Sequence, residues 1–185
     1  MNNKAIITEI DKALIDAIKV ENKRAFGMAD FYFDNDKKYP GIIDKEEIIN
    51  PFLQDQYKLS WYHRTSTSVL SVMEYNYGNK MDKVEETTPV QLIIFTRAAL
   101  SFETIKDWFV SALPSVLNKA ICESLQIFNC TIEVRSTEMN SNVVFKEECT
   151  EPNVRVGGQY GLIAIRYEIK TSYRRGCQTF CDCTN

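Results

Sequence analysis

The sequence is poor in residue types that several classes of enzyme and fibrous protein require. It contains one histidine, His63, together with seven glycines and five prolines among 185 residues. A Ser–His or Cys–His catalytic pair would have to use His63, and the surrounding WYHRTS matches no nucleophile motif. The glycines and prolines are too few for a collagen-like or low-complexity chain. We therefore expect His63 to be a structural or an exposed residue near the end of a strand, on the same face as Trp61.

Long apolar runs and an excess of one charge are also lacking. The formal net charge is −3, without a Lys/Arg-rich block, and this disfavours a nucleic-acid-binding protein. No stretch approaches the roughly 18 apolar residues that a membrane span requires. The amino terminus carries Glu9, Asp11 and Asp16 where a signal peptide needs an uninterrupted apolar segment. We therefore expect a protein that is made in the cytoplasm and does not associate with a membrane.

Motifs for phosphate, calcium and acid–base chemistry are missing as well. Gly157-Gly158 precedes an expected strand rather than opening a helix, so it does not match a phosphate-binding loop. Asp34 and Asp36 suggest a calcium loop, but Lys38 stands where the next ligand is needed. No two carboxylates are spaced as an evident acid–base pair. The sequence thus predicts no catalytic residues and no cofactor.

Cysteine is the remaining candidate metal-ligating residue type, with six copies. Cys177, Cys181 and Cys183 follow one another as C-x3-C-x-C, which is neither a zinc knuckle pair nor a CxxC redox motif. A zinc site would need a fourth ligand, for which Cys149 is the candidate. A Cys-ligated zinc adaptor or regulatory domain is therefore the alternative hypothesis. We favour thiols that stay reduced on a C-terminal arm, because cytoplasmic proteins rarely form disulfides.

Hydrophobic periodicity predicts a helix at the amino terminus. Residues 4–22 have the 3.6-residue period of an amphipathic helix. The apolar stripe is formed by Ile7, Ile10, Leu14, Ala17 and Ile18. The charged residues expected mostly on the opposite face are Asp11, Lys12, Asp16 and Lys19. A second helix is predicted over 101–125, with Ser101 as its cap and a break or kink at Pro114.

Between and after these helices the period is two, which is typical of strands. The predicted strands are 57–63, 69–77, 90–96, 128–135 and 159–173, and 142–149 could pair with the fourth of them. Residues 90–96 are apolar on both faces, as expected of a central strand. Gly78-Asn79 supplies a turn. Residues 23–56 have no clear period, and within them DKEEIINP predicts a short helical turn that stops at Pro51.

This order of elements predicts an α+β fold. We expect a mainly antiparallel β-sheet with an N-terminal amphipathic helix and a second helix packed on one face. Residues 1–173 would form a single domain, with 23–56 as an irregular charged and aromatic insertion. Residues 174–185 would form a C-terminal cysteine-containing arm.

Tyrosine is abundant, and this favours an interaction protein. Tyr residues are enriched at protein–protein contacts, where an apolar ring meets a wet edge. Core packing can account for some of the nine tyrosines, but the number exceeds what one small core needs. The tyrosines concerned are Tyr32, Tyr39, Tyr62, Tyr75, Tyr77, Tyr160 and Tyr173.

The layout resembles the head–tail connector and tail-terminator ring proteins of tailed bacteriophages. The resemblance covers residues 4–173, while 23–56 and the cysteine arm lie outside the shared layout. It rests on the order of a helix, a β-meander, a crossing helix and a last pair of strands. The matching segments are IITEIDKALIDAI, then YKLSWY, TSVLSVMEYNY and VQLIIFTRA, then SFETIKDWFVSAL, and finally CTIEVRS and GLIAIRYEIKTSY.

The resemblance implies a structural rather than an enzymatic role. Copies of such a protein form a ring, typically sixfold or twelvefold, in the neck or tail of the virion. The ring contacts portal, neck or tail proteins, and DNA passes through its lumen without sequence-specific binding. A mildly acidic chain suits this role, because a basic lumen would hold DNA back. Repeated contacts around a ring need large complementary surfaces and extended arms rather than a catalytic pocket.

Overall fold

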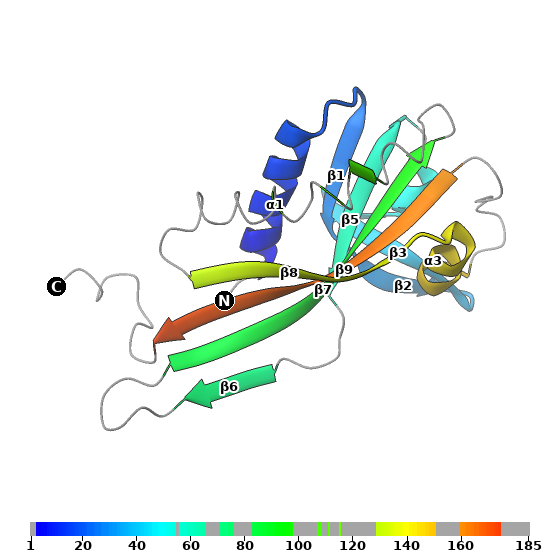
Figure 1. Ribbon diagram of the computed structural model, residues 1–185. Coiled ribbons are helices and arrows are strands. Elements are labelled where there is room, and N and C mark those ends of the chain that lie inside the picture. Colours follow the sequence, from blue (N-terminus) through cyan, green and yellow to red (C-terminus); the bar gives the residue numbers. More distant parts are fainter. Residues whose placement is uncertain are drawn as a thin grey trace.

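The computed structural model describes residues 3–54, 56–65, 71–75, 83–97, 107–108, 111, 115, 129–150 and 160–174. Within these ranges the predicted α+β class is confirmed: an N-terminal helix accompanies mostly antiparallel strands (Figure 1). The elements in chain order are α1 (Asn3–Ala17), β1 (Lys23–Met28), β2 (Asp30–Asp34), β3 (Lys37–Asp44), β4 (Glu47–Ile49), η1 (Pro51–Leu53), β5 (Leu59–Thr65), β6 (Ser71–Tyr75), β7 (Lys83–Arg97), β8 (Asn129–Glu138), α3 (Ser141–Glu148) and β9 (Tyr160–Arg174).

Most strands belong to one large sheet with the order β1-β5-β7-β9-β8, in which β6 also pairs with β7. Strands β7 and β9 pair along their whole length, from Lys83 opposite Arg174 to Arg97 opposite Tyr160. On the other side of β7, β5 pairs with 90–96 and β6 pairs with 83–87. The prediction of a central strand at 90–96 is confirmed, because these residues are buried and hydrogen-bonded on both sides. The pairing of β1 with β5 is parallel.

One face of the large sheet is covered by α1. The hydrophobic core on this side is called the α1-side cluster. Along β5, β7 and β9 its residues alternate with residues that point to the opposite face, as the period of two requires. Trp108, which is helical and belongs to the predicted second helix, packs against it partly buried. The cluster contains Ile6, Ile7, Ile10, Leu14, Ile18, Leu59, Trp61, Val90, Leu92, Ile94, Ile132, Ile163, Ile165, Tyr167 and Ile169.

The opposite face is covered by α3, η1 and part of a small three-stranded sheet, β2-β3-β4. Its core, called the α3-side cluster, contains Ala29, Ile42, Phe52, Tyr62, Ile93, Phe95, Val144, Cys149, Leu162 and Ala164. Because both faces are covered, all residues of β5 from Leu59 to His63 are buried. This strand therefore supplies side chains to both sides of the molecule.

Residues 23–56 are not an irregular insertion, and the helical turn predicted there is wrong. They form β1, the small sheet and the short 3-10 helix η1. Two hairpin turns connect the strands of the small sheet, at Asn35-Asp36 (φ 47° and 67°) and Lys45-Glu46 (φ 49° and 74°). Paired positive φ values are what two-residue hairpin turns require. Asn-Asp is a recognisable pair for such a turn, whereas Lys-Glu is not, so the second hairpin carries no sequence signal.

Four further predictions about segment boundaries and types need correction or fall outside the described residues. The first helix ends at Ala17 rather than at residue 22, and Asn22 adopts φ 54° just before β1. Residues 142–149 do not pair as a strand, because Asn140 caps helix α3 by accepting from the N–H groups of Asn142 and Val143. The turn at Gly78-Asn79 and the arm after Arg174 lie outside the described residues.

Candidate functional site

Beneath α1, the lone histidine is the centre of a buried polar network. His63 is 0% exposed, and its Nε2 lies 2.8 Å from Oδ1 of Asp11. The indole Nε1 of Trp61 donates to the same carboxylate oxygen at 2.8 Å. On the other side of the ring, Nδ1 of His63 lies 2.9 Å from the hydroxyl of Tyr167. Strand β5 therefore attaches α1 to the sheet through Trp61 and His63, and β9 completes the network.

The positions of the protons in this network follow from burial and charge. Burial raises the pKa of Tyr167 well above its usual value, and the negative charge of Asp11 adds to this effect. Tyr167 therefore keeps its proton. The Asp11 carboxylate only accepts hydrogen bonds, so Nε2 of His63 carries a proton and donates to it in either charge state of the ring. In the neutral ring, Nδ1 has no proton and accepts from the Tyr167 hydroxyl.

This Asp–His–Tyr arrangement resembles a proton relay, but its histidine and tyrosine are shielded from solvent. His63 and Tyr167 are 0% and 1% exposed, and both ring nitrogens have partners. Because no reacting group could approach the ring, the network holds α1 in place rather than acting on a substrate. Sequence reasoning placed Asp11 mostly on the outer face of the helix, and this was wrong. Asp11 lies four residues after Ile7 and three before Leu14, so its spacing within the stripe was the signal.

A second buried network lies on the opposite face, where α3 meets β5. Glu148 is 0% exposed. Its Oε2 accepts from the Tyr62 hydroxyl at 3.0 Å, and its Oε1 accepts from Nη2 of Arg64 at 2.7 Å. The same Nη2 donates to Oε1 of Gln91 at 2.7 Å. Burial, followed by the charge of Glu148, raises the pKa of Tyr62 well above its usual value, so Tyr62 remains a protonated donor.

The network continues as a row of side chains across three neighbouring strands. Arg64 on β5 is the register partner of Gln91 on β7, which in turn is the partner of Arg166 on β9. Helix α3 provides a carboxylate for each arginine, because Glu147 pairs with Arg166 at 3.1 Å while Glu148 pairs with Arg64. The charges cancel in pairs, so the row serves to seat α3 on the sheet. Sequence reasoning identified none of these residues, since their partners are remote in the chain.

The small sheet is attached to the same helix through Lys38. The backbone N–H of Lys38 donates to Oγ1 of Thr150 at 2.6 Å, and the N–H of Thr150 donates to the Lys38 carbonyl at 2.8 Å. The ring of Phe31 has the Lys38 ammonium and the Arg64 guanidinium each 4.4 Å from its centroid. Such cation–π contacts are worth about 0.5–2 kcal/mol each. The β2–β3 hairpin is thereby held against the end of α3.

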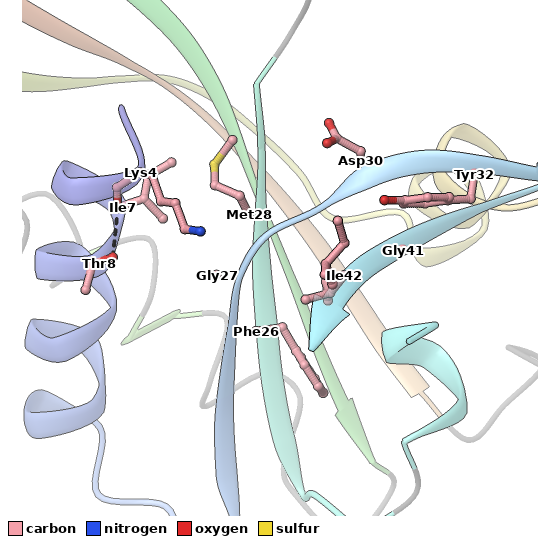
Figure 2. Close-up of a pocket in the computed structure, with 11 residues that line it drawn as sticks. Lys4, Ile7, Thr8, Phe26, Gly27, Met28, Asp30, Tyr32, Gly41 and Ile42 are labelled. Carbon is pink, nitrogen blue, oxygen red and sulfur yellow. Dashed lines mark hydrogen bonds between the residues drawn. The ribbon is translucent and has the colours of Figure 1, made fainter. Parts of the chain in front are cut away.

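A groove opens where α1, β1 and the small sheet meet, with a volume of about 320 Å³. Figure 2 shows β1 running between α1 on one side and the β2–β3 hairpin on the other. Its lining is mixed: the apolar residues include Ile7, Phe26, Met28 and Ile42, and the polar residues are Lys4, Thr8, Asp30 and Tyr32. At its centre Gly27 adopts φ 75°, in a bulge that shifts the register between β1 and β5.

The outer face of the small sheet is apolar and exposed. Ile43 and Ile48 are partners across β3 and β4, and they are 69% and 50% exposed. The Tyr32 ring lies directly on Gly41, where an added Cβ would be 2.2 Å from Cδ2 of Tyr32 and 2.8 Å from Cγ2 of Ile48. The absence of a side chain at Gly41 thus leaves room over β3 for the Tyr32 ring and the Ile48 side chain. We call Tyr32, Gly41, Ile43 and Ile48 the apolar patch.

The cysteines of the alternative zinc hypothesis are not brought together in the described part of the chain. Cys149 is 2% exposed within the α3-side cluster, whereas Cys177, Cys181 and Cys183 lie outside the described residues. Within the described residues, no group of three or more His, Cys, Asp or Glu side chains is placed to hold a metal ion. A site that used Cys149 would have to open the α3-side cluster.

Comparison with known proteins assigns no family. No protein-family model matches this chain, and no curated protein matches it either. Among the helices in the described residues, none is long and apolar enough to cross a membrane. The groove and the apolar patch are therefore the features from which a function can be argued.

Proposed function

We propose that this protein is a structural subunit whose copies assemble into a ring through the apolar patch. The observation that carries the proposal is the exposure of Ile43 and Ile48 side by side on the small sheet. Exposed apolar residues that cluster, rather than occurring singly, mark protein–protein contact sites. Covering the two exposed side chains would contribute about 2–3 kcal/mol to each contact. A head-to-tail contact of this kind, repeated with rotation, closes a ring.

The internal construction of the subunit supports this role. Both buried networks join a helix to the large sheet, and Lys38 joins the small sheet to α3. These links hold the apolar patch in one orientation relative to the rest of the domain. A preorganised surface loses less entropy on association than a flexible one, which favours a repeated contact.

The setting that we propose for the ring is the neck or tail of a tailed bacteriophage, joining head and tail or terminating the tail. This part of the proposal rests on the resemblance in element order. It implies a sixfold or twelvefold homo-oligomer in the virion that contacts portal, neck or tail proteins and surrounds a DNA conduit. It involves no catalytic residue and no cofactor.

Oligomeric state tests the proposal directly. Light scattering and negative-stain images should show rings of the full chain, and Ile48→Lys should release monomers because it places a charge in the apolar patch at a residue that does not line the groove. Ile15→Lys is the matched control, since Ile15 is 40% exposed on α1, away from the apolar patch. A strictly monomeric wild-type chain that also fails to bind a portal or tail component would overturn the proposal, as would equal loss of rings in both variants.

A further inference from the structure

The groove between α1, β1 and the small sheet is suited to binding an extended polypeptide. Among the described strands, β1 lies at the end of the large sheet and pairs only with β5. Its outer edge faces the groove, between α1 and the small sheet (Figure 2). The unpaired N–H and C=O groups of an edge strand bind the backbone of another extended segment. The chemistry of this edge thus selects a peptide.

The groove has room for a large side chain of such a peptide. A Cβ built on Gly27 would have no atom within 4 Å, so the space beside the bulge is open. This space lies between Phe26 and Met28, and Ile7 and Ile42 complete its apolar lining. Lys4 extends from α1 toward β1, and Asp30 stands at the opposite margin (Figure 2). The seat therefore suits an aromatic side chain with charged residues of both signs nearby.

The C-terminal arm of this chain has that chemistry. It contains one aromatic residue, Phe180, in the sequence RGCQTFCDCTN. Asp182 follows by two positions, so in an extended strand both side chains point to the same side. Arg175 precedes them. The arm thus offers a negative charge to Lys4 and a positive charge to Asp30.

The strand register indicates that an arm with Phe180 beside Gly27 would belong to another copy of the chain. Met28 on β1 is the register partner of His63 on β5. His63 is the partner of Leu92 on β7, which is the partner of Ile165 on β9, so Met28 and Ile165 lie at the same level of the sheet. Arg174 lies nine positions beyond Ile165, which is about 30 Å along the strand. Phe180 follows Arg174 by six positions and reaches about 20 Å from it even when fully extended. The arm of the same chain therefore falls short of the seat between Phe26 and Met28.

We propose that the groove at β1 binds the C-terminal arm of a neighbouring copy, residues 175–185, with Phe180 seated beside Gly27. This inference rests on the proposed ring, in which each subunit would extend its arm into the next. It also gives the residues around Phe180, including the three clustered cysteines, the role of an extended contact segment.

A labelled peptide tests the seat in the full-length protein. The acceptor is the full chain with Phe180→Ala, so that its own arm cannot occupy the groove of another copy. Fluorescence anisotropy, under reducing conditions, should show saturable binding of a peptide of residues 175–185. The same peptide with Phe180→Ala should bind about tenfold more weakly or worse, because an aromatic anchor dominates such contacts.

Charge exchange provides the specific control. Lys4→Glu in the acceptor should weaken the wild-type peptide several-fold, and a peptide with Asp182→Lys should recover the lost affinity. Absence of saturable binding, or equal affinity of the peptide lacking Phe180, would overturn the inference. A native mass spectrum showing only monomers, together with hydrogen-exchange protection of the groove that is lost in Phe180→Ala, would also overturn it.

The outcomes separate this inference from the proposed function. Peptide binding by a wild-type chain that forms no rings and binds no portal or tail component would support the groove and contradict the ring. Rings that persist in the Phe180→Ala chain, together with no peptide binding, would support the ring and contradict the groove.

Discussion

Trp61 and Tyr62 are adjacent on β5, yet each donates a hydrogen bond to a buried carboxylate on an opposite face of the sheet. Trp61 donates to Asp11 of α1, and Tyr62 donates to Glu148 of α3. The alternation of a strand thus attaches two helices at consecutive positions. Because each carboxylate is buried, the stability of each attachment depends on all of its partners being present.

Asp11→Ala should destabilise the protein by about 3 kcal/mol, because it leaves the N–H groups of Trp61 and His63 buried without an acceptor. Urea unfolding followed by tryptophan fluorescence measures the effect. Asp16→Ala is the matched control, because Asp16 is exposed on the same helix, and it should change stability by less than about 0.5 kcal/mol. Equal effects of the two substitutions would contradict the role assigned to Asp11.

Glu148→Ala should cost about 3–5 kcal/mol, because it leaves the Arg64 guanidinium, whose side chain is 18% exposed, without its counter-ion. Glu147→Ala removes the neighbouring pair with Arg166, in which both side chains are 40% exposed or more. That change should cost at most about 1 kcal/mol, as is usual for exposed ion pairs. Denaturant midpoints compare the two variants, and a larger loss for Glu147→Ala would refute the assignment.

Alkaline conditions should unfold the protein through its two buried tyrosines. The pKa values of Tyr62 and Tyr167 are raised above the usual 10.0 by burial. The unfolded chain therefore loses these protons first, so their contribution to stability is complete below pH 10.0 and declines as the pH rises above it. Unfolding free energies between pH 8 and 11 should fall less steeply in Tyr167→Phe than in wild type. An identical slope would show that Tyr167 is not buried in its protonated form.

Gly41→Ala should disturb the apolar patch without unfolding the large sheet. The new methyl group would be 2.2 Å from Tyr32 and 2.8 Å from Ile48, so the Tyr32 ring has to move. Overpacking of this kind costs about 1–3 kcal/mol. Adding Tyr32→Ala should recover part of the loss, because it removes the clash. Thermal melts of the single and double variants measure the coupling, and independent, additive effects would show that the Tyr32 ring does not pack on Gly41.

Hydrophobic periodicity identified α1 and the strands at the centre of the large sheet, but it missed β1 and the small sheet within residues 23–56. The stripe around Ile10 predicted α1, and the doubly apolar run 90–96 predicted the central strand β7. It failed where turn conformation decides the outcome. Lys45-Glu46 makes a hairpin turn through positive φ values that neither residue type favours. It failed again at 142–149, where the cap provided by Asn140 outweighs a strand-like pattern.

The sequence by itself therefore determined the α+β class, the N-terminal helix and the strands that build the core, because the spacing of apolar residues is a local property. The tertiary structure alone decided which polar side chains are buried and which apolar ones are exposed. His63 meets Asp11 across 52 residues, and Tyr62 meets Glu148 across 86. A buried polar group is defined by its partner, and that partner is supplied only when remote segments pack together.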